Sequence, residues 1–363
     1  MIGSSVRIAE LQAILGDHDA AEKALLSLRG DCGDVLGDHR YCRDAVEQLA
    51  RVYLDQGRRE EAEAAYRDVV AMVEASAADD GDALGTAHHN VGFALMEQGR
   101  LDDAEPWFRR GREHQVAASG EASLEVAVFD KSLATLDLRR GRFVEAEAGF
   151  RRVLETRTRL SGGDHPLTGS APNDVGVALF QQGRVADAVP FMERAVAVFE
   201  ASYGPLHMET LIGTNNVCIL LQNLERTDEA MPRCVRAADG FRTLFGDAHS
   251  HSLMASMSLA GAELKAGRPG DARARLAEGL PRARDAFAEE NPIVLARWLL
   301  NLAKAELALG DRTAAVALAA EGGALVASTD AASDADRQRV AEIEAALRDE
   351  SPPGSIESAA APR

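Results

Sequence analysis

The stretch DQGRREEAEAAYRDV at residues 55–69 recurs along this 363-residue chain. Similar text reads EQGRLDDAEPWFRRG at 97–111, RRGRFVEAEAGFRRV at 139–153 and QQGRVADAVPFMERA at 181–195. The glycines of these copies, Gly57, Gly99, Gly141 and Gly183, lie 42 residues apart. The same step reaches Glu225 and Gly267, and steps altered by one residue reach Gly310 and Gly16. Self-similarity at such a period indicates one supersecondary element stacked many times.

On either side of Gly99 the chain predicts two amphipathic helices. Val91 and Leu95 stand one turn apart before the glycine, and Ala104 and Phe108 stand one turn apart after it. This spacing places each pair on one helical face. A glycine just past a helix end readily takes the left-handed conformation that reverses the chain. Each repeat is therefore predicted to be a helix–turn–helix hairpin.

Side-chain size follows the same register in all eight repeats. An alanine stands five residues after each turn point, at Ala21, Ala62, Ala104, Ala146, Ala188, Ala230, Ala272 and Ala315. A small residue stands seven before it, at Ala9, Ala50, Gly92, Ala134, Gly176, Cys218, Ala260 and Ala303. A larger residue follows the alanine by four in every repeat except the last, at Leu25, Tyr66, Phe108, Phe150, Met192, Cys234 and Leu276. This pattern predicts helices that approach closely, with a larger side chain filling each gap.

Glu225 is the one departure at a turn point. A non-glycine residue in the left-handed conformation costs on the order of 1–2 kcal/mol. Asn223 is therefore the alternative residue to carry this turn.

These small–small–large helix pairs resemble the tetratricopeptide repeat, in its longer, kinesin-light-chain-like bacterial variety. That variety ends its repeats with loops of the form Gly-x-x-His-Pro-x-Thr, and this chain has LGDHRY at 36–41, GGDHPLT at 162–168, YGPLHMET at 203–210 and FGDAHSHS at 245–252. The family motif AEPLYRRAL is matched by AEPWFRRG at 104–111. His165, His207 and His249 are 42 residues apart, and we interpret them as loop residues that cap successive helices.

The resemblance implies an all-α fold, a right-handed superhelical solenoid of eight helix–turn–helix repeats with a C-terminal capping helix. The solenoid is expected over 1–328, with repeats near 3–37, 38–79, 80–121, 122–163, 164–205, 206–247, 248–289 and 290–328. The capping helix is expected at 333–349, because the last repeat must present a polar outer face. A disordered tail is expected at 350–363. No cap precedes the first repeat, so we expect a larger protein or a partner at that end.

Composition excludes several classes of function. The net charge of −18 argues against a nucleic-acid partner, because such affinity comes largely from cations that neutralise phosphates. An acidic surface is compatible with solvation alone or with a cationic partner. No apolar run approaches a membrane span, and the N-terminus has no signal-peptide pattern. Cys218 and Cys234 occupy packed positions, so they are expected to be thiols in a reducing compartment, and the expected localisation is cytoplasmic.

Residues that could perform chemistry do not form a catalytic pattern. The nine histidines include the adjacent pair His88 and His89, which cannot share a helical face. The sequence contains no GxSxG, HExxH, P-loop or GxGxxG motif. We therefore expect no enzyme activity, no metal and no cofactor.

Binding is the better hypothesis. In the resembled family the first helix of each pair lines the concave groove that holds ligands. The candidate groove residues here are Glu47, Arg51, His89, Phe93, Lys131, Arg139, Asn173, Phe180, Asn215, Gln222, Met257 and Lys304. Asn173 and Asn215 match family asparagines that hold a peptide main chain, and an amide both donates and accepts. The alternative is that these residues form ordinary solvated helix faces.

Two functions remain open. The first is a non-catalytic scaffold or adaptor that binds a protein or peptide in the groove. Acidic residues stand early in the groove and cations late, so the basic end of the ligand is expected toward repeats two and three. The alternative is a sensor module of a larger bacterial signalling protein, such as a kinase or STAND ATPase regulator. The partner and the oligomeric state are left open.

Overall fold

The computed structural model describes residues 2–31, 40–76, 81–329 and 332–348. These residues form helices and no strands, which confirms the all-α fold. They group into two compact bodies, Met1–Gln182 and Gly183–Arg363, which we call the N-terminal and C-terminal bodies. The predicted fifth repeat, 164–205, contributes one helix to each. The predicted tail at 350–363 lies outside the described residues.

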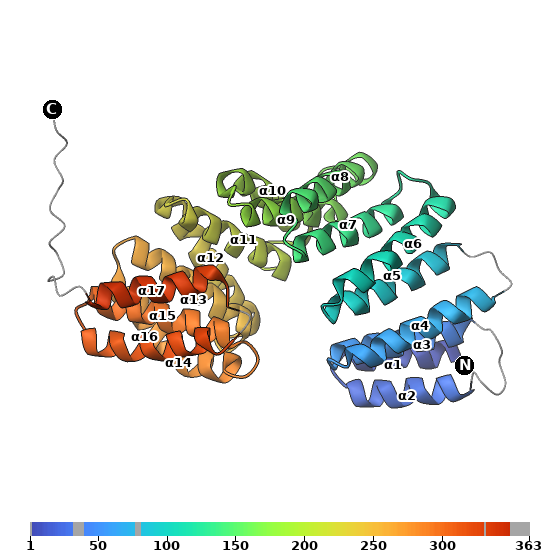
Figure 1. Ribbon diagram of the computed structural model, residues 1–363, viewed down its shortest axis with the longest axis horizontal. Coiled ribbons are helices and arrows are strands. Elements are labelled where there is room, and N and C mark those ends of the chain that lie inside the picture. The colour runs from blue at the N-terminus through green and yellow to red at the C-terminus, as the bar shows by residue number, and fades with distance from the viewer. Residues whose placement is uncertain (1, 32–39, 77–80, 330–331, 349–363) are drawn as a thin grey trace. The chain divides into compact units, whose positions relative to one another are not determined.

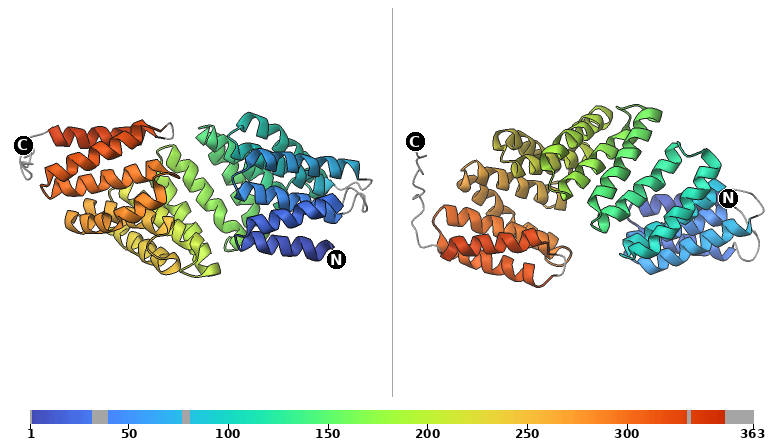
Figure 2. Two further views of the ribbon diagram at one scale, coloured as in Figure 1. Left: turned by 90° about the horizontal axis from the view of Figure 1, so that it is seen from below. Right: turned by 45° about the horizontal axis from the view of Figure 1, so that its top comes forward.

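The N-terminal body contains nine helices within the described residues (Figure 1). They are α1 Ile2–Ile14, α2 His18–Asp31, α3 Arg40–Asp55, α4 Arg59–Ala75, α5 Gly81–Glu97, α6 Leu101–Ser119, α7 Leu124–Arg139, α8 Phe143–Ser161 and α9 Pro166–Gln181. Each helix packs on the next along the chain, and Figure 2 shows them as successive antiparallel rods. The first helices of neighbouring hairpins also touch, as α1 does α3 and α5 does α7.

The C-terminal body continues the same pattern over its described residues. Its helices are α10 Val185–Tyr203, α11 Met208–Asn223, α12 Thr227–Phe245, α13 Ser250–Lys265, α14 Pro269–Phe287, α15 Pro292–Ala308, α16 Arg312–Ala327 and α17 Asp334–Arg348. The first helices α11, α13 and α15 contact one another in sequence. The last helix, α17, packs on α15 and α16, and its Ile343 is buried against them. It covers the end of the last hairpin, as the polar amphipathic sequence predicts.

The turns have the predicted left-handed backbone. Gly99 has φ +76°, and nothing lies within 4 Å of the Cβ that a larger residue would add there. Glu225 takes the same conformation with φ +58°, so Asn223 does not carry that turn. The turn of this repeat therefore keeps its position in the 42-residue register, although a non-glycine residue is unfavourable in this backbone conformation.

The small and large positions of each hairpin face each other. A Cβ added to Gly92 would lie 2.9 Å from the ring of Phe108, so only glycine fits beside that ring. The equivalent pair in another hairpin, Cys218 and Cys234, forms a disulfide between α11 and α12, with a Cα–Cα distance of 5.2 Å. The expectation of two packed thiols is therefore wrong. Both residues are fully buried, as expected, but each sulfur is bonded to the other.

The histidine loops act as predicted. His165, His207 and His249 are the N-cap residues of α9, α11 and α13. In each case the ring Nδ1 accepts a hydrogen bond from the backbone N–H two residues later, at 3.2 to 3.3 Å. One of the N–H groups left open at each helix start is satisfied in this way.

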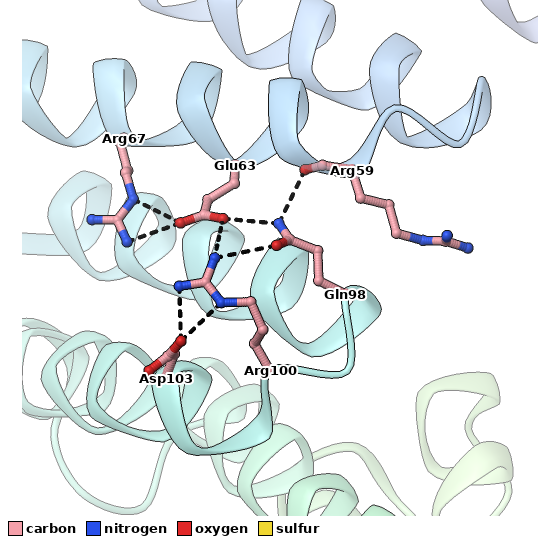
Figure 3. Close-up of polar contacts among 6 residues, drawn as sticks. All are labelled: Arg59, Glu63, Arg67, Gln98, Arg100 and Asp103. Atoms are coloured by element: carbon pink, nitrogen blue, oxygen red, sulfur yellow. Dashed lines mark hydrogen bonds and ion pairs between the residues drawn. The ribbon is translucent and has the colours of Figure 1, made fainter.

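A polar junction joins consecutive hairpins in the N-terminal body (Figure 3). Glu63 of α4 is 9% exposed, and its carboxylate accepts from Gln98 Nε2 and Arg100 Nη1, each at 2.8 Å. Arg67, on the following turn of α4, donates to the same carboxylate. Burial opposes ionisation of Glu63, but its hydrogen bonds and the charge of Arg100 hold its pKa below the usual value.

Candidate functional site

The candidate residues of the N-terminal body lie on first helices that are linked by polar contacts. Asn90 Nδ2 of α5 donates to Glu47 Oε1 of α3 at 3.3 Å. Lys131 Nζ of α7 lies 2.8 Å from Asp174 Oδ2 of α9. Both contacts join residues 43 positions apart. Glu47 and Lys131 therefore hold equivalent positions in their repeats. Each contacts the first helix of the next repeat, α5 for Glu47 and α9 for Lys131.

Arg51 stands beside a cavity between α1, α2 and α3. Arg51 is bonded within α3 to Glu47 at 3.0 Å. The cavity has a volume of about 200 Å³, and its lining includes Glu10, Ile14, Arg51 and Asp55. Two acidic side chains and an apolar wall make it suitable for a long cationic side chain.

His89 and Phe93 occupy successive turns of α5 but have different environments. His89 is half-buried between the rings of Phe108 and Phe129, and its Nε2 lies 2.9 Å from Ser132 Oγ. Burial lowers the pKa of His89, so the ring stays neutral near pH 7. Phe93 is 38% exposed and leaves its ring open to a ligand.

Arg139 is held by hydrogen bonds within the protein, whereas Phe180 is partly exposed. Arg139 donates to the Met96 carbonyl at 2.9 Å and to Glu97 Oε1 at 2.6 Å, which ties α7 to α5. Phe180 is 36% exposed near the end of α9. Asn173 is half-buried on the same helix, and no hydrogen bond of its amide is found among the described residues.

In the C-terminal body, Asn215 of α11 has an unsatisfied amide. The residue is half-buried, and its Oδ1 is buried without a hydrogen-bond partner in the described part of the chain. A buried acceptor left unpaired costs about 1–3 kcal/mol. Met257, 42 residues later on α13, is partly buried and packs against the core of this body. Asn215 therefore has unused hydrogen-bonding capacity, whereas Met257 contributes to packing.

Gln222 does not belong to an open face. It is only 9% exposed, and its Nε2 donates to Cys218 Sγ at 3.1 Å and to the Ser258 carbonyl at 3.0 Å. Its own carbonyl accepts from Lys265 Nζ at 2.5 Å. Gln222 thus links α11 to α13, and little of its side chain is left exposed for a ligand.

The late cations are paired with the capping helix. Lys304 Nζ lies 3.7 Å from Glu342 Oε2 of α17, and its pKa is lowered, chiefly by burial. Arg297 donates twice to Asp336, at 2.6 and 2.8 Å. The side chain of Asp336 is only 3% exposed. Arg297 is therefore firmly engaged in holding α17, and Lys304 is paired with it more loosely.

Sequence reasoning missed the partners of its own candidates. Asn90, Ser132 and Asp174 are 42 residues apart, each one position after a candidate residue. That shared register was the available signal. It predicts a second row of polar side chains alongside the first, and the structure pairs the two rows between neighbouring first helices.

Other kinds of site are not found in the described residues. No group of three His, Cys, Asp or Glu side chains there is placed to hold a metal ion. Within ranges 2–31, 40–76, 81–329 and 332–348, no helix has both the length and the apolar character that a bilayer crossing requires.

Comparison with known proteins identifies the repeats. Two models of the tetratricopeptide repeat match residues 47–121 and 125–201. No curated protein matches in sequence. The structure of BtubC (BKLC) from P. vanneervenii is similar with a TM-score of 0.52 and 21% identity, over 68% of this chain and 91% of that one.

Two further structures resemble longer parts of the chain. A STAND protein with a tetratricopeptide repeat sensor from Pyrococcus horikoshii matches with a TM-score of 0.64 and 14% identity, over 89% of this chain and 47% of that one. A Rap protein complexed with competence and sporulation factor matches with a TM-score of 0.54 and 13% identity, over 96% and 98%. At these identities the likeness concerns the fold. The family models show tetratricopeptide repeats over residues 47–121 and 125–201, and the likeness of these folds extends the same repeated helical hairpins over most of the chain.

Proposed function

We propose that this chain is a non-catalytic docking module that binds an extended peptide, or an extended segment of a protein, along its first helices. The unsatisfied amide of Asn215 carries the proposal, because a peptide N–H would supply the missing donor. Asn173 occupies the same register position one repeat earlier and has an amide available for the same purpose. The Rap protein that resembles this chain is itself complexed with a factor, which supports a ligand of this class.

Apolar and acidic groups add specificity to main-chain recognition. The exposed rings of Phe93 and Phe180 offer contact area for ligand side chains. Glu10 and Asp55 line the cavity beside α1 and α3, so a lysine or arginine of the ligand fits there. We therefore propose that a basic segment of the ligand lies over this part of the N-terminal body. Acidic recognition at the other end is not proposed, because Lys304 and Arg297 are paired with α17.

The test uses peptides selected from a random phage-displayed library against the whole chain. We expect Asn215→Ala to weaken selected peptides that bind the C-terminal body, and Asn173→Ala those that bind the N-terminal body, each about tenfold, the cost of one or two main-chain hydrogen bonds. Glu155→Ala is the control, since this side chain is exposed on the second helix α8. Equal affinities for wild type and both asparagine variants, at unchanged helicity, would reject the groove assignment.

A second candidate function is a sensor module in a larger signalling protein. The observation in its favour is the match to the STAND protein with a tetratricopeptide repeat sensor, which covers most of this chain and about half of that one. Sequencing the reading frame on both sides of this chain tests it. An ATPase or kinase domain in the same polypeptide supports the sensor, and flanking stop codons eliminate it.

We propose a cytoplasmic location. The disulfide between Cys218 and Cys234 removes the argument from reduced thiols, because structural disulfides persist mainly in oxidising compartments. Fractionation of the source cells, with the cysteine state trapped by alkylation, decides the question. A disulfide-bonded chain outside the cytoplasm would overturn this location.

A further inference from the structure

The C-terminal body contains a small polar cavity that lies apart from the proposed peptide-binding residues. It lies between α12, α13, α14 and α15 and has a volume of about 100 Å³. Ser252 and Arg282 are among its lining residues, and Trp298 forms part of its wall. A volume of this size holds a few water molecules or one small ion.

Ser252 places an unsatisfied hydroxyl at this cavity. The residue is 5% exposed, and its Oγ has no hydrogen-bond partner in the described chain. The residues 42 and 84 positions earlier, Thr210 and Thr168, are completely buried and satisfied. Their hydroxyls donate to the carbonyls of Gly204 and Gly162, at 3.0 and 2.8 Å.

Ser252 can therefore be compared with the equivalent threonines of the two preceding repeats. Gly246 stands where Gly204 and Gly162 stand in the earlier repeats, but Ser252 does not donate to it. A buried hydroxyl without a partner is unfavourable by about 1–3 kcal/mol. An acceptor bound in the cavity would supply the partner that this hydroxyl lacks.

Arg282 places a second open donor in the same cavity wall. Its Nε is buried and has no hydrogen-bond partner among the described residues. Its nearest carboxylate, Glu278, is 3.7 Å from Nη2 and has a side chain that is 80% exposed, so the pair is loose. Two residues that line the cavity therefore each carry a buried donor without a partner in the described chain.

The other charges around the cavity are balanced or turned toward solvent. Arg242 is paired with Asp239 at 2.7 Å, and Arg275 is paired with Glu263 at 2.8 Å. Asp247, also in the lining, is exposed. Arg282 is thus the lining cation least neutralised by its neighbours.

We propose that this cavity is a binding site for a small oxyanion of the phosphate class. An oxyanion has only acceptor atoms, so it satisfies the Ser252 hydroxyl and Arg282 Nε together, and hydrogen bonds from a guanidinium to an oxyanion are among the strong ones. The cavity lies beside the first turn of α13, where backbone N–H groups and the helix dipole also favour an anion. The ligand is free phosphate or the phosphoryl group of a small molecule.

The experiment is isothermal titration of the whole chain with inorganic phosphate, with sodium chloride of equal ionic strength as the blank. O-phospho-L-serine forms a second arm, and tighter binding of it than of phosphate identifies a phosphoryl group as the ligand. We expect saturable binding of phosphate, weakened about tenfold or more in Arg282→Gln, which removes a charged donor. Arg284→Gln is the matched control, since Arg284 on the same helix pairs with Glu321 and does not line the cavity.

A second variant keeps the test independent of folding failures. Ser252→Thr restores the residue of the two earlier repeats, and its hydroxyl is expected to bond the Gly246 carbonyl as Thr210 bonds Gly204. This variant should melt no lower than wild type yet bind phosphate more weakly. Absence of saturable phosphate binding to the wild type, or equal affinity in the wild type and Arg282→Gln, overturns the proposal.

Discussion

Arg100 Nη1 lies 2.8 Å from Glu63 Oε2, and this ion pair joins the turn of one hairpin to the second helix of the preceding hairpin (Figure 3). The same relationship occurs one repeat earlier, where Arg58 Nη1 lies 2.7 Å from Glu22 Oε2. In a repeat protein, stability is shared between each repeat and its interface with the next. These turn arginines therefore contribute to the interface rather than to one hairpin.

Glu63→Ala should destabilise the junction between α4 and α6. The substitution leaves Gln98 and the partly covered arginines Arg67 and Arg100 without their common acceptor. Because both arginines stay partly hydrated, we expect a loss of about 1–2 kcal/mol in the free energy of unfolding. Amide hydrogen exchange over 59–119 measures it, since local opening there should become easier.

Glu60→Ala is the control for this prediction. Glu60 lies on the same helix, three residues before Glu63, and is exposed. Its removal should leave hydrogen exchange unchanged. Equal exchange in the two variants would mean that the junction adds nothing to the interface.

Asp336 makes the attachment of the capping helix dependent on pH. The Arg297 guanidinium, together with Ser333, holds the pKa of Asp336 well below its usual value, although burial opposes this. A carboxylate with a lowered folded pKa stabilises in full above its unfolded pKa of about 3.9 and loses that stabilisation as pH falls below it. We expect α17 to loosen between about pH 4 and pH 2.

Asp336→Asn should remove this acid-sensitive component and cost about 2 kcal/mol at pH 7, since it leaves Arg297 without its charged partner. Urea unfolding at several pH values measures both effects. Asp334→Asn is the matched control, because the Asp334 side chain is fully exposed and pairs with Arg337 on its own helix. A steep acid loss that persists unchanged in Asp336→Asn would assign the effect to another carboxylate.

The fold could be predicted from the sequence because the same pattern of residues recurs in every repeat. Gly99 and its counterparts mark the turns, and Ala104 and Phe108 mark the packed faces, so every repeat confirms the others. Glu225 shows why one repeat alone would mislead. Its own residue preference argues against the left-handed turn that it adopts, and only the register predicts that turn.

The candidate site was less predictable, because a register assigns a face and does not say whether a side chain is free. Lys131 lies on the predicted face but is paired with Asp174. The Gln222 amide donates to Cys218 and to the Ser258 carbonyl, so its hydrogen-bonding capacity is used within the protein. The partner of Lys131 is 43 residues away, and the Ser258 carbonyl that Gln222 reaches is 36 residues away on α13. The periodicity within one helix does not predict such neighbours.

The disulfide should make the hairpin of α11 and α12 sensitive to reductant. Cys218 and Cys234 close a loop with a sequence separation of 16 residues. A loop of about this length stabilises by about 3 kcal/mol in the chain-entropy model. We expect reduction to lower the thermal midpoint of the C-terminal body, measured by circular dichroism with and without a phosphine reductant.

The control is a double variant, Cys218→Ala with Cys234→Leu, which copies the equivalent pair Ala260 and Leu276 of the next hairpin. It keeps a small residue opposite a large one and has no bond to reduce. Its midpoint should not respond to reductant at this hairpin. A wild-type midpoint that is equally unresponsive, with the 218–234 link shown by peptide mapping to be reduced, contradicts the predicted contribution.

Glu225→Gly should stabilise the chain. At φ +58° a side chain costs on the order of 1–2 kcal/mol, whereas glycine adds about 0.5–1 kcal/mol of unfolded-state entropy, so the net gain is expected to be about 1 kcal/mol. Gly183→Ala is the mirror experiment, because Gly183 holds the same turn position with φ +75° and has nothing within 4 Å of an added Cβ. It should lose about as much as Glu225→Gly gains, since both changes act on the backbone alone. Urea unfolding followed by circular dichroism measures both, and a Glu225→Gly variant no more stable than wild type would show that the turn at 225 stores no strain.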